Sequence, residues 1–202
     1  MNSIKINRKL PTLYSRCFLL ATRDEIGNYG LEMLLRQVRL DRFKNLTPHM
    51  IQEMVITASE FAELQQSIRD YYGLGAHGLL NRIGRGTWIY MVKRGSLQDK
   101  VRMLLTKLWP RSFRSRKALE YLAAGICGID GCVSVHLYDQ DLLFLDQTSD
   151  ATYGQITTEP ICWVTTGMIQ GVLSWAMGEE PDIEEISCRA TGSENCKFKV
   201  KL

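Results

Sequence analysis

The sequence predicts an α/β fold of the α+β type, in which a helical N-terminal half packs on a small, mainly antiparallel sheet. Up to about residue 127, apolar residues recur at intervals of three and four, as they do along one face of a helix. After Gly131 the interval becomes two, which is typical of strands. A single helical stretch then interrupts the strands, so the C-terminal half is expected to run strand–strand–helix–strand–strand.

The first helices are expected after an irregular or weakly strand-like arm over residues 1–22. A helical pattern begins at Asp24 and continues through Val38. In "LTPHMIQEM", Thr47 is placed as an N-cap with Pro48 in the first turn, and this helix should run to Gly73. Three further helices are expected, over about 79–91, 97–109 and 115–127.

The strands follow from the alternation in "CVSVHLYD". Val133, Val135 and Leu137 should share one face, and His136 and Tyr138 the other. A turn at 139–141 leads to a second strand over 142–147. A buried helix over about 158–177, closed by Gly178, precedes a terminal hairpin of strands 183–190 and 196–202.

Composition limits the class of protein. The chain has 202 residues, of which 45% are hydrophobic and 23% charged, as in an ordinary globular protein. Its net charge of +3 is too small to indicate a direct nucleic-acid partner. Its apolar runs are shorter than the roughly 18 residues that span a bilayer, and charges interrupt the N-terminus as they would not in a signal peptide. We therefore expect a cytoplasmic protein.

The last cysteines raise a question of chemistry. Cys188 and Cys196 flank a tight turn between paired strands, and Cys162 stands in the first turn of the preceding helix. Three sulfurs with Glu185 would make a closed tetrahedral zinc site, but a disulfide or simply buried thiols would also fit the spacing. In a regular strand Glu185 and Cys188 point to opposite faces, so a metal site would need a bulge there, or else Glu184 as the ligand.

The motifs "EEISCRATGSENCKFKV" and "ICWVTTGMIQGVLSWAMGEE" resemble the 4-vinyl reductase-type (4VR) domain family. The resemblance covers about residues 75–202, and the helical region before it resembles the extension that often precedes this domain. It implies a ligand-binding domain over 75–202 and a dimerising helical extension over 1–74. The family includes sensor domains of aromatic-responsive transcriptional activators and is related to Golgi transport-particle subunits.

The resemblance also implies a metal site and a ligand. Its zinc ligands fall on Cys162, Glu185, Cys188 and Cys196. Many relatives carry an additional Cys-x-x-Cys-like segment where this chain reads "TSDATYG". The other three cysteines match nothing in the family and are expected to be buried thiols: Cys17, Cys127 and Cys132.

A hydrophobic or aromatic small molecule, possibly a tetrapyrrole, is the ligand that the resemblance implies. Trp88, His136 and Tyr138 are the candidate contacts, because small-molecule sites are mostly apolar with a few polar anchors. The glycines in the helices over 75–94 and 162–177 are expected to allow close approach of another element, or to open space for a cavity beside large aromatic residues.

Three functions are consistent with these features. The favoured one is a non-catalytic small-molecule-binding module with a structural zinc, acting in regulation or in pigment- or photosystem-related assembly. The alternatives are a vinyl-tetrapyrrole reductase and an assembly factor of the transport-particle type. The sequence has no motif for a redox cofactor, and this disfavours the reductase.

Two contact surfaces are predicted. The apolar stripe of Met50, Met54, Val55 and Phe61 should join two copies of the chain as a homodimer. A basic cluster could contact an acidic partner or an anionic surface, although a solvated face is the ordinary explanation; it comprises Lys107, Arg111, Arg114, Arg116 and Lys117.

Overall fold

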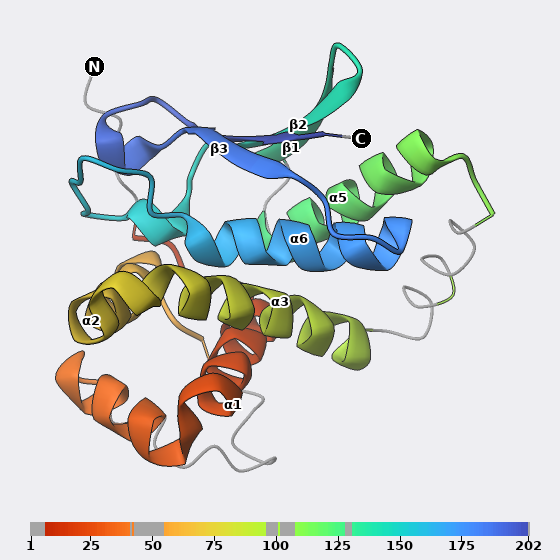
Figure 1. Cartoon of the computed structure of the whole chain (residues 1–202). Helices are drawn as coiled ribbons and strands as arrows, with labels where there is room; N and C mark the ends of the chain where they lie inside the picture. The colour runs from red at the N-terminus through yellow and green to blue at the C-terminus, as the bar shows by residue number, and fades with distance from the viewer. Residues whose placement is uncertain are drawn as a thin grey trace.

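The computed structural model describes residues 7–40, 42, 55–95, 101, 108–127 and 131–201. A four-stranded sheet forms the first layer, and two helices, α5 and α6, cover one of its faces (Figure 1). Helices α3, α2 and α1 form the layers beyond. In chain order the main elements are α1 (Thr12–Gln37), α2 (Ala58–Tyr72), α3 (Ala76–Arg94), α5 (Arg111–Cys127), β1 (Val133–Tyr138), β2 (Asp141–Asp146), α6 (Trp163–Met177), β3 (Ile183–Ser187) and β4 (Cys196–Val200). The predicted α+β class and the strand–strand–helix–strand–strand order are confirmed.

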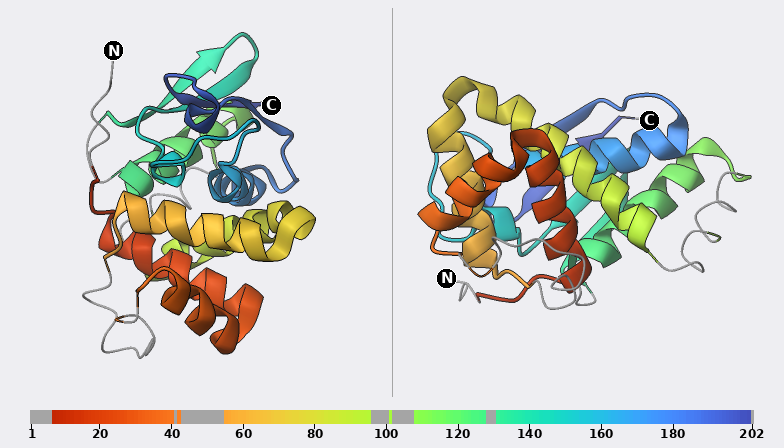
Figure 2. Two further views of the ribbon diagram at one scale, coloured as in Figure 1. Left: turned by 90° about the vertical axis from the view of Figure 1, so that its left-hand side faces the viewer. Right: turned by 90° about the horizontal axis from the view of Figure 1, so that it is seen from below.

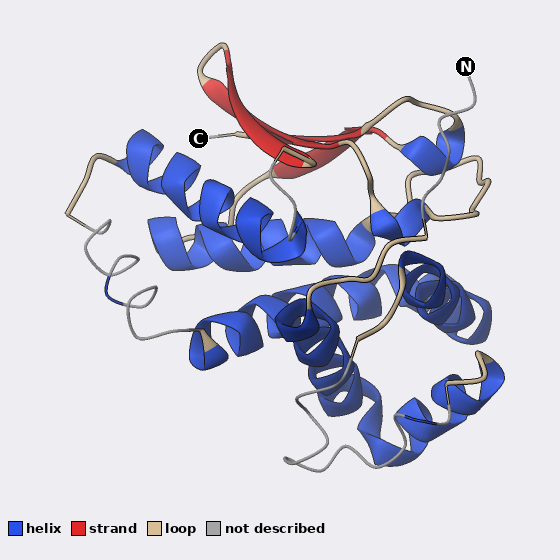
Figure 3. Cartoon of the chain, turned by 180° about the vertical axis from the view of Figure 1, so that it is seen from behind, coloured by secondary structure: helices blue, strands red, loops and turns tan. Residues whose placement is uncertain are grey.

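The sheet is antiparallel throughout, with the strand order β1-β2-β4-β3. Its helix-covered face is apolar, and Phe144 pairs with Phe198 at its centre, with ring centroids 6.0 Å apart. The other face of the strands has no helix over it (Figure 3). Val133 and Val135 lie on the covered side, as the alternation predicted, but Leu137 at the end of β1 is 66% exposed.

Helices α3 and α6 meet through glycine. A Cβ atom on Gly84 would approach the carbonyl oxygen of Val164 to well inside 3.0 Å, and one on Gly167 would do the same to the carbonyl oxygen of Asn81. The two backbones are therefore in direct contact. Close approach was one of the two roles expected of these glycines. The other is wrong, because the partner helix fills the space that would have formed a cavity.

The first part of α1 corrects the prediction of an irregular arm. Residues 12–22 are helical, and the helix follows Pro11 and is bent at Gly27, where φ is 77° and ψ is 169°. The helical period is hidden in the sequence because this segment is buried on nearly all sides, Ser15 and Leu19 as well as Phe18. Figure 2 shows α1 crossing beneath α3.

The start of α2 also differs from the prediction. Residues 55–57 are extended, so no continuous helix runs from Thr47 to Gly73; residues 43–54 lie outside the described ranges. Thr57 is the N-cap, and it forms a capping box with Glu60. The Leu10 amide donates to the Ile56 carbonyl at 2.9 Å, which holds the extended segment against the chain before α1.

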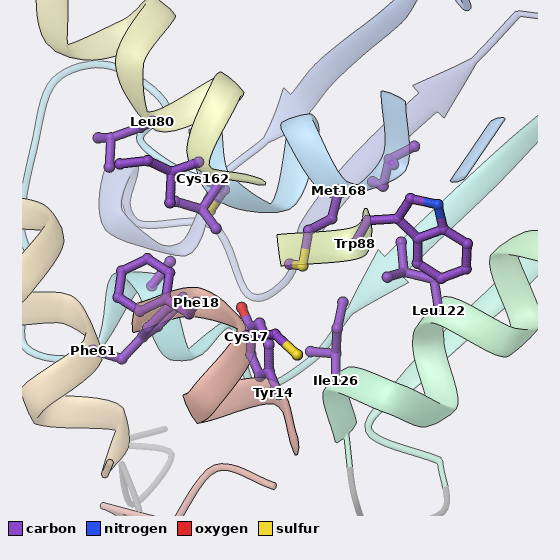
Figure 4. Close-up of a cluster of buried hydrophobic side chains, with 14 of the residues drawn as sticks. Tyr14, Cys17, Phe18, Phe61, Leu80, Trp88, Leu122, Ile126, Cys162 and Met168 are labelled. Atoms are coloured by element: carbon purple, nitrogen blue, oxygen red, sulfur yellow. The ribbon is translucent and has the colours of Figure 1, made fainter. Parts of the chain in front are cut away.

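The predicted dimer stripe is partly internal. Phe61 is 1% exposed, and its ring lies 5.4 Å from that of Tyr14 and 4.7 Å from that of Phe18 (Figure 4). Phe61 thus belongs to the core of its own chain and is not available to a partner. Met50 and Met54 lie outside the described residues.

The basic residues near the start of α5 are largely engaged in ion pairs. Arg111 pairs with Glu179, and both Arg116 and Lys117 pair with Glu120. Lys107 and most of the predicted helix 97–109 lie outside the described residues. None of the helices within the described ranges is long and apolar enough to cross a membrane.

The three remaining cysteines differ from one another. Cys17 is a fully buried free thiol, as predicted, and burial raises its pKa to about 12. Cys127 and Cys132 were expected to be buried thiols as well, but they form a disulfide that joins the end of α5 to the start of β1. Their Cα atoms are 5.9 Å apart, since the chain turns back between the two elements.

Candidate metal centre

Four potential metal ligands converge where α6 begins and the terminal hairpin turns. Cys162 is the N-cap residue of α6, Glu185 and Cys188 lie in and just after β3, and Cys196 opens β4. One ligand atom from each lies within 4.8 Å of all the others. The Cys162 sulfur is 3.8 Å from that of Cys188 and 3.4 Å from that of Cys196.

The hairpin supplies Glu185 through a bulge. Glu185 pairs with Phe198 and Ser187 with Lys197, so Ile186 is an extra residue in β3. This irregularity is the one that a regular strand would have needed to bring Glu185 to the side of Cys188. Glu184 is exposed and pairs with Lys199. Glu185, and not Glu184, is therefore the carboxylate that reaches the cluster.

A metal ion fits the donor set. All three sulfurs belong to residues that are 0% exposed. Oxygen Oε1 of Glu185 is buried with no hydrogen-bond partner, whereas Oε2 accepts from the Cys162 amide at 3.2 Å. A buried carboxylate oxygen left without a partner is costly unless a cation satisfies it. Thiolates bound tetrahedrally at about 2.3 Å from zinc lie about 3.8 Å apart, close to the separations here.

Protonation of the cluster without a metal follows from burial. Desolvation raises the pKa of Cys162 well above its usual value and that of Glu185 to about 8. The pKa of Cys188 is lowered, because the thiols of Cys162 and Cys196 donate hydrogen bonds to its sulfur. The metal-free cluster therefore shares one thiolate and retains its other protons, which a divalent cation would have to displace.

Donors around the cluster favour negative sulfur. The Arg189 amide donates to the Cys196 sulfur at 3.2 Å, and the Ser149 hydroxyl lies 3.4 Å from the Cys162 sulfur. Arg69, from α2, is close enough for the sulfurs of Cys162 and Cys188 to raise its pKa, although burial lowers that pKa more. Such outer contacts typically orient the ligands of a metal site and balance their charge.

The structure does not bring the three predicted ligand-binding residues together. Trp88 is 2% exposed and lies beside Leu122 and Met168 in the core (Figure 4). His136 and Tyr138 lie on the other side of the sheet: His136 is exposed and its ring nitrogen is 2.8 Å from the Ser134 hydroxyl, and Tyr138 is 46% exposed. A cavity between α1 and α2, which the sequence did not reveal, is described below.

Comparison with solved structures shows that this α+β architecture is shared with several sensory and gas-binding domains. The H-NOX protein from S. oneidensis, solved in the Fe(II)NO ligation state, is 10% identical with a TM-score of 0.58 over 93% of this chain and 98% of that one. An oxygen-binding H-NOX domain related to soluble guanylate cyclases is 14% identical, with a TM-score of 0.54 over 92% and 90%. The phenol-responsive sensory domain of the transcription activator PoxR is 19% identical, with a TM-score of 0.50 over 72% and 74%.

The sequence narrows this class for one segment. Residues 150–202 match the model of the 4-vinyl reductase (4VR) domain, which confirms the family resemblance predicted from the cysteine motifs. The matched segment contains all four residues of the cluster. No curated protein matches the chain.

Proposed function

We propose that this chain is a non-catalytic small-molecule-binding module of the sensor type, whose C-terminal 4VR segment is held together by a structural zinc. The observation that carries the proposal is the closed cluster of three buried cysteines and Glu185 within the segment that matches the 4VR domain. Folds similar to that of this chain include domains described as binding nitric oxide, oxygen or phenol, which supports small-molecule binding as the general role.

Zinc is the metal that this donor set favours. Three thiolates and one carboxylate, fully enclosed, make a four-coordinate tetrahedral site with no open position for substrate. Such a site acts on folding, because the ligands come together only in the folded state. Here it would fasten the start of α6 to the hairpin of β3 and β4.

The likeness to H-NOX proteins does not by itself extend to haem. Haem iron is commonly held by an axial histidine. Within the described residues, the His77 ring stacks on that of Trp163 at 5.0 Å at the surface, and His136 lies on the uncovered face of the sheet. The proposal therefore concerns an apolar or aromatic ligand, with a tetrapyrrole as one member of the panel to be tested.

A thermal-shift experiment tests the binding role. Purified protein would be heated with phenol, 1-hydroxypyrene and protoporphyrin IX over a range of concentrations. A ligand that binds only the folded state raises the melting temperature in proportion to the logarithm of its concentration once it is in excess. If none of the three changes the melting temperature, the binding proposal is wrong, and the assembly-factor alternative replaces it. Turnover of a vinyl tetrapyrrole with NADPH would contradict the non-catalytic role.

Zinc binding is expected to release a proton from Glu185. Since the pKa of this carboxyl is about 8 in the metal-free cluster, it is mostly protonated at neutral pH and must lose that proton to become a ligand. Its contribution to apparent affinity is therefore complete above a pH of about 8 and decreases as the pH falls. Calorimetry in buffers of different ionisation enthalpy should show about one proton fewer released by Glu185→Gln than by the unmodified protein.

The neighbouring substitution Glu184→Gln is the matched control for this measurement. Glu184 is one residue away in the same strand, but it is exposed and lies outside the cluster. Its replacement should leave both the proton count and the zinc affinity unchanged. An identical proton count in all three proteins would show that Glu185 does not bind the metal.

A further inference from the structure

An open cavity of about 880 Å³ lies between the second half of α1 and the end of α2. The bend at Gly27 creates it, because the helix beyond that residue turns away from α2 (Figure 1). The wall on the α1 side carries Tyr29 and Met33, and Tyr71 and Tyr72 from the last turn of α2 form the opposite wall. This region is distinct from the metal cluster and from Trp88, His136 and Tyr138.

The lining of this cavity is aromatic and unusually exposed for its size. Tyr29 is 77% exposed, Tyr71 76%, Met33 48% and Tyr72 38%. The rings of Tyr71 and Tyr72 meet edge to face, with centroids 5.0 Å apart. Four large side chains gathered around one hollow leave an apolar surface that a soluble monomer would ordinarily cover, and such surfaces mark binding sites.

The polar groups around the cavity indicate the chemistry of its ligand. Asn28 and Gln37 supply amides, and the tyrosines supply hydroxyl groups. Arg36 is the one charged residue among the described residues of the lining, and the carboxylate of Glu32 pairs with it at 2.5 Å. The lining thus offers hydrogen bonds without an unbalanced charge, which suits a neutral molecule.

We propose that this cavity, which we call the tyrosine pocket, is the ligand site of the module, and that it takes an uncharged polycyclic aromatic molecule with hydroxyl or carbonyl substituents. The inference rests on the proposed binding function and specifies its site. Small-molecule sites commonly have volumes of about 300 to 1,000 Å³, so the pocket is far larger than one benzene ring needs. Tyrosine faces and edges bind fused rings through offset stacking and edge-to-face contacts.

The probe for the test is 1-hydroxypyrene, whose fluorescence anisotropy reports binding directly. The test variant is the double substitution Tyr29→Ala and Tyr71→Ala, since both side chains are more than three-quarters exposed and the fold should tolerate their removal. Tyr138→Ala is the matched control, because it removes an exposed tyrosine from β1, away from the pocket. Circular dichroism would confirm that all the proteins are folded.

We expect 1-hydroxypyrene to bind the unmodified protein and Tyr138→Ala alike, with binding to the double variant weakened roughly tenfold or more through loss of two aromatic contacts. Phenol should compete only weakly. Equal binding to all three proteins would overturn the tyrosine pocket as the site but leave the binding function intact. Failure of 1-hydroxypyrene to bind the unmodified protein, while another ligand raises its melting temperature, would likewise overturn only the pocket. If no ligand binds in either experiment, both proposals fail.

Discussion

Replacing Cys188 with serine is expected to abolish zinc binding and to lower the free energy of unfolding by several kcal/mol. The Cys188 sulfur is fully buried at the meeting point of α6 and the terminal hairpin. Without it the remaining donors no longer complete a tetrahedron, and the binding free energy that zinc contributes to folding is lost. Denaturant unfolding with parallel metal analysis measures both effects.

The matched control for this substitution is Cys17→Ala. Cys17 is a fully buried free cysteine, but it lies in α1 and outside the cluster. Its replacement should cost about 1 kcal/mol for the cavity it leaves and should not change the zinc content. A Cys188→Ser variant that is as stable as Cys17→Ala and retains its zinc would show that the cluster is only a group of buried thiols.

The second large effect is expected at the contact between α3 and α6. Gly167→Ala should destabilise the protein by about 3 kcal/mol or more, because its Cβ would collide with the backbone of Asn81 and the two helices would have to separate. Gly84→Ala should behave similarly, since it faces the backbone of α6 from the other side. The midpoint of urea unfolding measures the loss.

Gly78→Ala is the control, since this glycine lies in α3 and an added Cβ would have only the side chain of Arg82 near it, at 3.7 Å. It should be neutral or stabilising by about 0.5 to 1 kcal/mol, as alanine favours a helix over glycine. If Gly167→Ala were as stable as Gly78→Ala, the close packing of α3 and α6 would be wrong.

The sequence predicted the C-terminal half of the fold well, because its signals are local. The alternation at Val133 and Val135 and the glycine after α6 correspond to the observed β1 and to the left-handed C-cap at Gly178. The helix before that cap begins at Trp163 rather than near 158, because the preceding segment runs to the hairpin, where the Thr157 amide donates to the Ala190 carbonyl.

The N-terminal half was harder to predict, for a physical reason. A helix buried on all sides, such as the one around Phe18, has no polar face to set its period. The start of α2 at Ala58 depends on a capping box and on backbone pairing with the segment before α1, a contact between distant parts of the chain. The bend at Gly27 opens the tyrosine pocket, and no local pattern indicated it.

The four residues of the metal cluster could be selected from the sequence only through the family resemblance, because their spacing also fits buried thiols. The bulge at Ile186 is what brings Glu185 to Cys188, and strand alternation alone argued against it. For the ligand, His136 and Tyr138 were chosen by alternation, and the structure places both on the uncovered face of the sheet. The disulfide of Cys127 and Cys132 had no signal in the sequence beyond their short separation.

The most direct test of a structural zinc in this module is metal analysis of the protein purified without chelators. Elemental analysis by plasma mass spectrometry, normalised to protein concentration, should give about one zinc per chain in the unmodified protein and much less than one in Cys196→Ser. The same zinc content should persist after dialysis at neutral pH, because a closed site with three thiolates releases its metal slowly. Unmodified protein that is folded and carries far less than one equivalent of any transition metal would contradict the account.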